Sequence, residues 1–250
     1  MAPVRGFSHG GTEARRNLRS PLLGVKVHWR RATPAKTLPR SEAKRSLAAI
    51  APCVTGETME ERFPARAVGY SVEAYFGLVH RGVIDEDDRI ELLDGVIVAE
   101  PPMDPPHASG ISLVAEALRR AVGTRALIRI QAPFIADWFS APEPDVAVVP
   151  GVVTDYLERH PTEALLVVEV SDSSLQQDRL SKSRIYAGAG VPEYWIVNLR
   201  DARVEVYRDP DPVQRLYGTR STAGCGETLQ LVAVDGATVA VDDLLPVSSR

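Results

Sequence analysis

The chain has 250 residues, of which 44% are hydrophobic, 25% charged and 6% aromatic. This composition can bury a sizeable core, which excludes a wholly disordered or collagen-like protein, and the length allows one domain with some excess. The formal net charge of −4 combines two unlike regions: residues 1–50 carry 11 basic and 2 acidic side chains, whereas residues 51–250 carry 18 and 31. The two regions therefore have formal charges of +9 and −13.

Residues 1–58 contain clustered Arg, Pro, Ser and Thr without helical or alternating periodicity. Such a composition predicts a disordered basic tail. Three origins are consistent with it: an arm that contacts nucleic acid, an organelle transit segment, or sequence upstream of the true start. We favour the third, because Met59 precedes the first patterned helix and would be a natural initiator. The folded domain is then expected over 68–247.

Cysteine content and hydropathy indicate the compartment. Cys53 and Cys225 are the only cysteines, and neither CxxC nor Cys/His spacing surrounds them, so no disulfide framework or zinc site is expected. No apolar run approaches the roughly 20 residues of a membrane helix. We therefore expect a soluble, cytoplasmic protein without a membrane partner.

The first half of the domain shows alternating helix and strand signals. An amphipathic pattern with Ser71 as its N-cap predicts a helix, and two short apolar runs around Asp94-Gly95 predict a hairpin with a type I′ turn. A second helical stripe follows a proline-rich stretch, and two strands come next. The expected ranges are helices 70–80 and 107–122, the hairpin 89–100, and strands 126–137 and 145–149.

The second half contains the strand expected at the centre of the sheet. Leu165–Ser171 is a nearly continuous β-branched and apolar run, typical of a strand buried on both faces. The remaining elements are expected to be helices at 154–160 and 174–189, and strands at 193–198, 203–208, 228–234 and 238–241. This order predicts an α/β (α+β) fold, with a mixed β-sheet flanked by helices.

Two acidic residues stand at strand positions where a charge is costly unless it is paired or bound to a metal. Glu169 lies inside the buried run LLVVEVS, and Asp145 begins the strand DVAVV directly after Pro144. Carboxylates at strand ends in one sheet can converge on a hard cation such as Mg²⁺, and Glu91 in the hairpin is a third candidate. For any one of them taken alone, a solvent-facing acid at a strand end is the more common case.

Lys182 is the one lysine after Lys44 in a chain with 25 arginines. A lysine can shift its pKa and orient or deprotonate a water, whereas a guanidinium stays charged and planar. Its retention beside these strands therefore suggests a specific task, with chance placement as an equal alternative. On a helix, Lys182 would share a face with Asp178 and Tyr186, and Asp178 could orient it by ion pairing.

Several stretches together carry a resemblance to a known family. The runs RIELLDGVIV, PPMDPPH, EPDVAVV, LLVVEVSDSS, DRLSKSRIYAGAGVPEYWIVN and RVEVYR occur in that order. The chain resembles the Uma2 family of endonucleases, within the PD-(D/E)XK nuclease superfamily, from about Val68 to Val247. The resemblance implies a restriction-endonuclease-like core and metal-dependent hydrolysis of phosphodiester bonds, with Mg²⁺ or Mn²⁺ as the cofactor.

The resemblance also implies roles for four residues. Asp145 is the Asp of the PD pair, Glu169 is the acid of the second motif, and Glu91 matches the acid of the first hairpin. Ser171 stands where the superfamily usually has its lysine, and the family's lysine on the following helix corresponds to Lys182. The implied site is therefore Glu91, Asp145, Glu169 and Lys182, with the three acids as metal ligands.

Other side chains near this site are weaker candidates. His107, at the start of the second helix, either lines the cleft or serves only the helix end. Tyr186, Tyr194 and Trp195 are expected in the core rather than as platforms for stacked bases, because two of them belong to the apolar strand YWIV.

The charge of −13 on residues 51–250 is unfavourable for binding DNA, where contacts between phosphates and basic side chains dominate affinity. Metal ligands account for part of the acidity, and Arg119, Arg120, Arg125 and Arg129 are grouped in sequence near the second helix. A homodimer could also build a cleft. A nuclease acting on DNA is the favoured function, and the alternative is an inactive nuclease-fold module in protein interaction or regulation.

Overall fold

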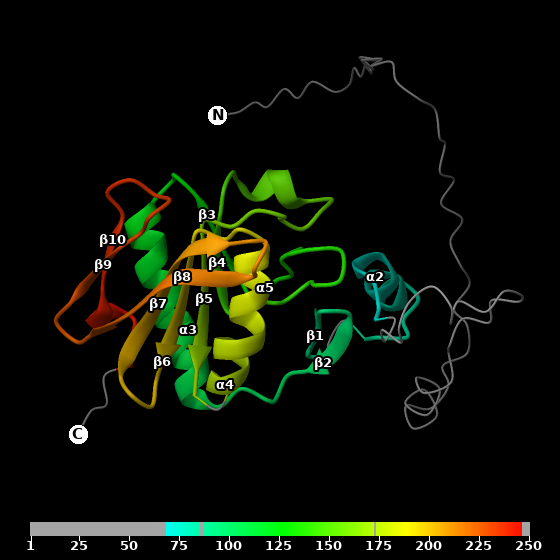
Figure 1. Cartoon of the computed structure of the whole chain (residues 1–250), viewed down its shortest axis with the longest axis horizontal. Coiled ribbons are helices and arrows are strands. Elements are labelled where there is room, and N and C mark those ends of the chain that lie inside the picture. Colours follow the sequence, from blue (N-terminus) through cyan, green and yellow to red (C-terminus); the bar gives the residue numbers. More distant parts are fainter. Residues whose placement is uncertain (1–68, 86–87, 173, 247–250) are drawn as a thin grey trace, which may run out of the picture. The chain divides into compact units, whose positions relative to one another are not determined.

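The computed structural model describes residues 69–85, 88–172 and 174–246, all of which belong to the unit Val54–Arg250. The expected tail at 1–58, Met59 and Cys53 lie outside the described residues. A six-stranded sheet occupies the middle of this unit, with helices on both faces (Figure 1). Within the described residues no helix is both long and apolar enough to cross a membrane.

The main sheet has the strand order β3-β4-β5-β6-β7-β8. β5 and β6 are parallel, and every other neighbouring pair is antiparallel, so the predicted mixed sheet is confirmed. The parallel pair needs a crossover connection, which the segment 174–189 provides. The strands are β3 (Leu127–Ile130), β4 (Val146–Val149), β5 (Leu166–Ser171), β6 (Glu193–Asn198), β7 (Arg203–Asp211) and β8 (Leu216–Gly224).

Side-chain alternation divides the core between the two faces of this sheet. On one face, Val168 and Val170 of β5 join a cluster with helix α3 (Pro105–Val122). On the other face, Val167 packs with Tyr186 and Tyr194 beside helix α5 (Ser183–Gly188). Every residue of β5 is buried, as its apolar sequence predicts. Tyr186, Tyr194 and Trp195 are all core residues, which confirms that expectation.

Helix α3 begins two residues before the expected start. Asp104 is its N-cap and accepts a hydrogen bond from the His107 amide at 2.9 Å, while Pro105 and Pro106 take the first helical positions, where no amide donor is needed. A Cβ atom on Gly110 would lie 2.8 Å from Val170 Cγ1. The glycine therefore lets the helix pack closely against β5.

The predicted hairpin forms a separate two-stranded sheet, β1 (Ile90–Leu93) and β2 (Val96–Ala99). Asp94 and Gly95 have φ values of 48° and 82°, as a type I′ turn requires. Helix α2 (Val72–His80), capped by Ser71, packs against the hairpin through Tyr75, Leu78 and Leu92. Hairpin and helix thus share a small core apart from the main sheet.

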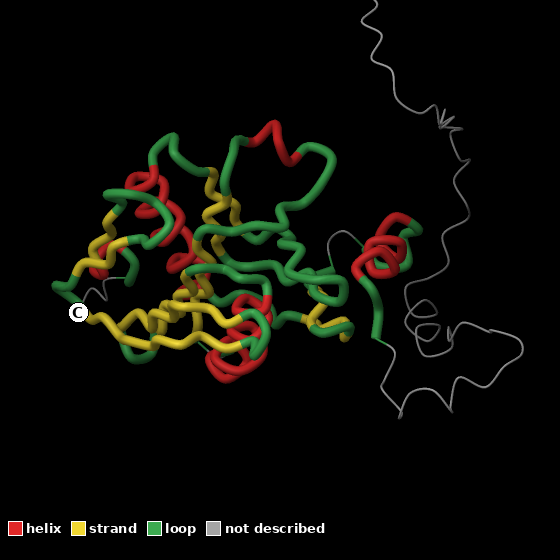
Figure 2. The backbone as a smooth tube through the Cα atoms, turned by 45° about the horizontal axis from the view of Figure 1, so that its top comes forward, coloured by secondary structure: helices red, strands yellow, loops and turns green. Residues whose placement is uncertain are grey.

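The expected strand at 126–137 is only partly correct. β3 ends at Ile130, and the chain continues as a loop to β4, one of the long green segments in Figure 2. Gln131 has a φ of +43°, which strand geometry does not allow, and Pro133 lacks the amide that a ladder needs. This loop carries the chain to Pro144 and Asp145.

The far edge of the sheet also differs from expectation. β8 was not predicted, because LYGTRSTAG is polar on both faces and contains two glycines, so it shows no alternation. β7 extends to Asp211, beyond the expected end at Arg208. The last two expected strands are shorter, as β9 (Thr228–Gln230) and β10 (Thr238–Ala240), and form a small hairpin of their own.

The two remaining predicted helices also take other forms. The expected helix at 154–160 is a 3₁₀ turn, η2 (Val153–Tyr156), seen as a short red coil within a loop in Figure 2. The helix expected at 174–189 is divided into α4 (Leu175–Gln177), the π-helical turn η3 (Asp178–Lys182) and α5. In the π turn, the Ser183 amide donates to the Asp178 carbonyl, five residues back.

A buried carboxylate ties the crossover segment to the edge of the sheet. Glu205 on β7 is fully buried and accepts hydrogen bonds from Arg179 Nε at 3.0 Å and Arg220 Nη2 at 2.6 Å. Burial alone would raise the pKa of Glu205, but hydrogen bonds from Arg179 and Asn198 and the charges of the two arginines lower it to about 2. The ionised form is therefore stabilised in the fold.

We predict that Glu205→Gln lowers the free energy of unfolding by ~2–3 kcal/mol near neutral pH, less than for a fully buried pair because both arginines reach solvent. The native pKa lies below the unfolded value, so the carboxylate contributes stability above about pH 4.5 and loses it as the pH falls toward 2. Urea unfolding of wild type and variant across this range should show the difference shrinking. A pH-independent difference would refute the assignment, and the exposed Glu116→Gln is the control.

Candidate active site

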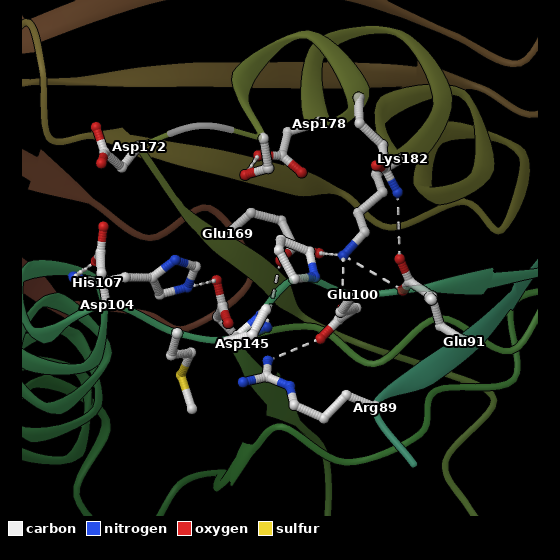
Figure 3. Close-up of a pocket in the computed structure, with 16 residues that line it drawn as sticks. Arg89, Glu91, Glu100, Asp104, His107, Asp145, Glu169, Asp172, Asp178 and Lys182 are labelled. Carbon is white, nitrogen blue, oxygen red and sulfur yellow. Dashed lines mark hydrogen bonds and ion pairs between the residues drawn. The ribbon is translucent and has the colours of Figure 1, made fainter.

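One pocket gathers residues from the hairpin, from α3 and from the ends of β4 and β5 (Figure 3). The four residues predicted from the sequence, Glu91, Asp145, Glu169 and Lys182, all line it. They are separated by up to 91 positions in the sequence, and each comes from a different element or loop. Sheet topology and the crossover segment bring them together.

Asp145 and Glu169 are held side by side where β4 begins and β5 ends. The Asp145 amide donates to Glu169 Oε2 at 3.3 Å, and the Val170 amide donates to Asp145 Oδ2 at 2.8 Å. These reciprocal bonds follow from the antiparallel pairing of the strands, in which Val146 is opposite Val168. Two carboxylates that the sequence places 24 residues apart therefore share one corner of the pocket.

The ammonium group of Lys182 lies among three carboxylates. Its Nζ is 3.1 Å from Glu169 Oε1, 3.3 Å from Glu91 Oε2 and 3.7 Å from Glu100 Oε1. The side chain is only 6% exposed. The lysine singled out by its rarity in the sequence therefore joins β5 to the hairpin.

Burial and charge act in opposite directions on the pKa of these groups. Burial would lower the pKa of Lys182, but Glu169, Glu91, Asp178 and Glu100 together hold it well above its usual value, so the ammonium stays protonated. Burial also raises the pKa of Glu169 and Glu91, with the charge of Lys182 opposing the rise. The site thus contains more buried carboxyl groups than the charge of Lys182 alone can keep at their usual pKa.

Glu91 is oriented by three donors. Besides Lys182, the amide of Glu143 donates to its Oε2 at 3.2 Å, and Gln177 Nε2 donates to its Oε1 at 3.4 Å. Glu100, which sequence reasoning missed, follows β2 and faces Lys182 from the same hairpin. Its position after the strand could not show that the hairpin would place it beside a lysine 82 residues further on.

Tyr186 and His107 support the two strand-end carboxylates. The Tyr186 hydroxyl donates to Glu169 Oε1 at 2.6 Å from within the core, a contact that its flanking residues in the sequence do not indicate. His107 lines the pocket, and its Nε2 lies 3.1 Å from Asp145 Oδ2. The hydrogen bond with Asp145 raises the pKa of His107. Of the two positions expected for His107, the one that lines the pocket is observed.

The expected ion pair between Asp178 and Lys182 does not form within 4 Å, since the ion pairs of Lys182 are with Glu91, Glu100 and Glu169. Asp178 is buried and accepts a hydrogen bond from Ser174 Oγ at 2.8 Å. Each of the two side chains is instead engaged by other groups, Asp178 by Ser174 and Lys182 by the three glutamates.

Asp145 and Glu169 offer oxygen donors that fit a hard divalent cation. Asp145 Oδ1 has one long contact, at 3.5 Å from Gln131 Nε2, which leaves its lone pairs open. In the described part of the chain, no three His, Cys, Asp or Glu side chains are grouped so as to hold a metal ion by themselves. Asp145 and Glu169 could supply two carboxylates to a bound cation, and water and substrate oxygens could complete its coordination, as is common for Mg²⁺.

Three of the four arginines that are grouped in sequence near the second helix have different neighbours. Arg120 lies near Glu116 and Asp243, and Arg125 donates to the carbonyl of Val122. Arg129 lies over the ring of Tyr156, with its Nη2 3.5 Å from His160 Nδ1.

Comparison with protein-family models matches residues 72–242 to Uma2, described as "Putative restriction endonuclease". The match covers more than half of the chain. The chain belongs to the Uma2 family. The resemblance seen in the sequence is thus confirmed, and the hairpin, the two strand-end acids and Lys182 all lie within the matched residues.

A crystal structure from Anabaena variabilis ATCC 29413, described as "a putative nuclease belonging to DUF820", is similar to this Uma2 chain. The TM-score is 0.56 at 14% sequence identity, and the alignment covers 70% of this chain and 97% of that one. At this identity the likeness shows a shared fold. The comparison with curated proteins found no match.

We predict that Lys182→Met destabilises the Uma2 domain by about 3–5 kcal/mol near neutral pH, because it leaves buried carboxylates without a counter-ion. Unpaired buried carboxylates have a raised pKa, so the stability they retain when protonated is lost as the pH rises through that value. The loss relative to wild type should therefore be larger at about pH 8 than at about pH 5 in urea unfolding.

The double variant Lys182→Met/Glu169→Gln is the matched comparison, because it also removes one of the carboxylates that the single variant leaves without a counter-ion. It should recover part of the lost stability at the higher pH. Equal losses at both pH values, with no recovery in the double variant, would show that the carboxylates do not depend on the lysine.

Proposed function

We propose that this Uma2 chain is a metal-dependent endonuclease that hydrolyses phosphodiester bonds in DNA. The description of the family and the likeness in fold to a protein described as "a putative nuclease belonging to DUF820" support the reaction class. The observation that carries the proposal is the geometry around Glu169, which lies against the Asp145 amide and 3.1 Å from the ammonium of Lys182. Two acids and a lysine at a strand end suit hydrolysis of a phosphodiester.

Asp145 and Glu169 are the proposed ligands of Mg²⁺ or Mn²⁺, and Glu91 contributes through water or through Lys182. When bound, such an ion would polarise the phosphate and lower the pKa of an attacking water. Tyr186 and the Val170 amide keep the two carboxylates in place, through bonds of 2.6 and 2.8 Å. The proposed ligands are thus oriented by the core before any ion arrives, which favours tight geometry.

Lys182 is proposed to position the attacking water or to offset charge that develops on the phosphate. Its three carboxylate neighbours keep it protonated, which favours orienting and neutralising over accepting a proton. Glu91 and Glu100 contact the ammonium from the hairpin, and Glu169 contacts it from β5. A guanidinium would not be an equivalent replacement, because it is planar and presents its donors in a fixed fork.

The excess of acidic side chains in the pocket is unfavourable for binding the phosphates of DNA. Among the residues that line it, seven are acidic and two, Arg89 and Lys182, carry a fixed positive charge. A divalent cation would offset part of this surplus, and a homodimer is proposed to supply further surface for the duplex. We expect moderate, metal-dependent affinity rather than tight unaided binding.

The test is cleavage of supercoiled plasmid DNA with Mg²⁺ or Mn²⁺. Asp145→Asn should lower the rate of nicking at least about 100-fold, more than is typical for residues that only support a ligand. Glu169→Gln should do the same. A chelator should abolish the activity of the wild type.

Glu116→Gln is the control, because it removes an exposed acid on α3 outside the pocket. Its rate should equal that of the wild type. No cleavage by the wild type with either metal, or equal cleavage by Asp145→Asn, would overturn the proposal and favour an inactive module that serves in protein interaction or regulation.

A further inference from the structure

The pocket offers a polyanionic substrate very few positive partners. Lys182 is committed to three carboxylates and is 6% exposed, so it has little surface to present to a phosphate at the pocket mouth. His107 is engaged by Asp145. Arg89 remains, with 34% of its side chain exposed and, among the described residues, one carboxylate partner, Glu100, at 2.9 Å.

Arg89 lies immediately before β1, and Glu100 immediately after β2, so the hairpin register brings them together. The Glu100 amide also donates to the Arg89 carbonyl at 2.9 Å, which fixes the backbones of both residues. Figure 3 shows the guanidinium in the lower part of the view, joined to Glu100 by a dashed line. The backbone is therefore rigid, while the charged end of the arginine is held by one exchangeable ion pair.

Glu100 is shared between the two cations of the pocket. Its Oε2 lies 2.9 Å from Arg89 Nη2, and its Oε1 lies 3.7 Å from Lys182 Nζ. If Arg89 turns toward a phosphate, Glu100 keeps Lys182 as a partner and is not left as an unpaired charge. The exchange costs little, because an ion pair that is partly exposed to solvent contributes little to stability.

We propose that Arg89 is the substrate-binding residue that contacts a backbone phosphate of DNA, and that Glu100 holds its guanidinium in the free protein. A guanidinium presents paired donors that match two phosphate oxygens, and it stays charged at any working pH. The inference rests on the proposed function and names the residue that would recognise the phosphate. It concerns binding and leaves the hydrolytic step to the strand-end acids and Lys182.

The experiment measures binding of a short fluorescein-labelled DNA duplex by fluorescence anisotropy, at several salt concentrations. Ca²⁺ replaces Mg²⁺ as a hard cation with the same oxygen preference, and intact duplex is verified after each titration. Arg89→Ala should bind about 10-fold more weakly, as expected for one charge-assisted hydrogen-bonded contact. The slope of log K against log salt should fall by about 1, the signature of one lost phosphate contact.

Arg89→Lys should keep the salt slope and recover part of the affinity, because the charge remains while the paired donors are lost. Glu100→Gln should tighten binding, and the gain should be smaller when Arg89 is alanine. Arg215→Ala is the matched control: this arginine is 28% exposed and pairs with Asp94 at 2.8 Å on the same hairpin, outside the pocket. Its affinity and salt slope should equal those of the wild type.

Plasmid cleavage is measured on the same samples, so that the two proposals can fail separately. Cleavage by the wild type, with Arg89→Ala unchanged in affinity and salt slope, would overturn the role of Arg89 alone. If the wild type neither binds nor cleaves DNA, the proposed function fails, and binding of inorganic pyrophosphate followed by calorimetry decides the inference. Pyrophosphate binding lost in Arg89→Ala supports a phosphate position at Arg89, and binding equal to wild type overturns it.

Discussion

The site depends on one buried ammonium. Lys182 lies within 3.1–3.7 Å of carboxylates from β5 and from the hairpin, two parts of the chain that otherwise belong to different hydrophobic clusters. Three acids in such a space would repel one another and resist ionisation without it. The lysine therefore acts as a structural centre before it takes part in any chemistry, and its neighbours settle its protonation state.

The main sheet holds two carboxylates of the site in fixed positions, and the hairpin supplies two further acidic side chains. Asp145 and Glu169 are fixed by backbone amides and by the buried hydroxyl of Tyr186, all within the packed core. The hairpin side chains approach from a separate two-stranded sheet, whose backbone pairs with the loop before β4 through Leu92 and Ala141. The site therefore has one wall set in the packed core and one wall that supplies two of the three carboxylates around Lys182.

Local patterns predicted the fold and much of the site, because the signals concerned were strong. Glu169 was conspicuous as a charge inside an apolar strand, and Lys182 as a lone lysine in an arginine-rich chain. Glu100 and Tyr186 were missed because their importance comes from tertiary neighbours and not from their flanking residues. β8 was missed because a polar edge strand lacks the alternation that burial of one face imposes.

The π-helical turn at Asp178–Lys182 determines the direction in which side chains before and after it point from the crossover segment. Gln177 reaches Glu91 and Tyr186 reaches Glu169, although nine positions separate them. At about 100° per residue, an uninterrupted α-helix would place the two on opposite sides, about 180° apart. The π turn contains one residue more than an α-helical turn, so the nine positions advance the helix by only about eight α-helical steps. The angle between the two side chains is then about 80°, and both meet the same group of acids. The number of residues in this turn is thus as much a part of the site as their identities.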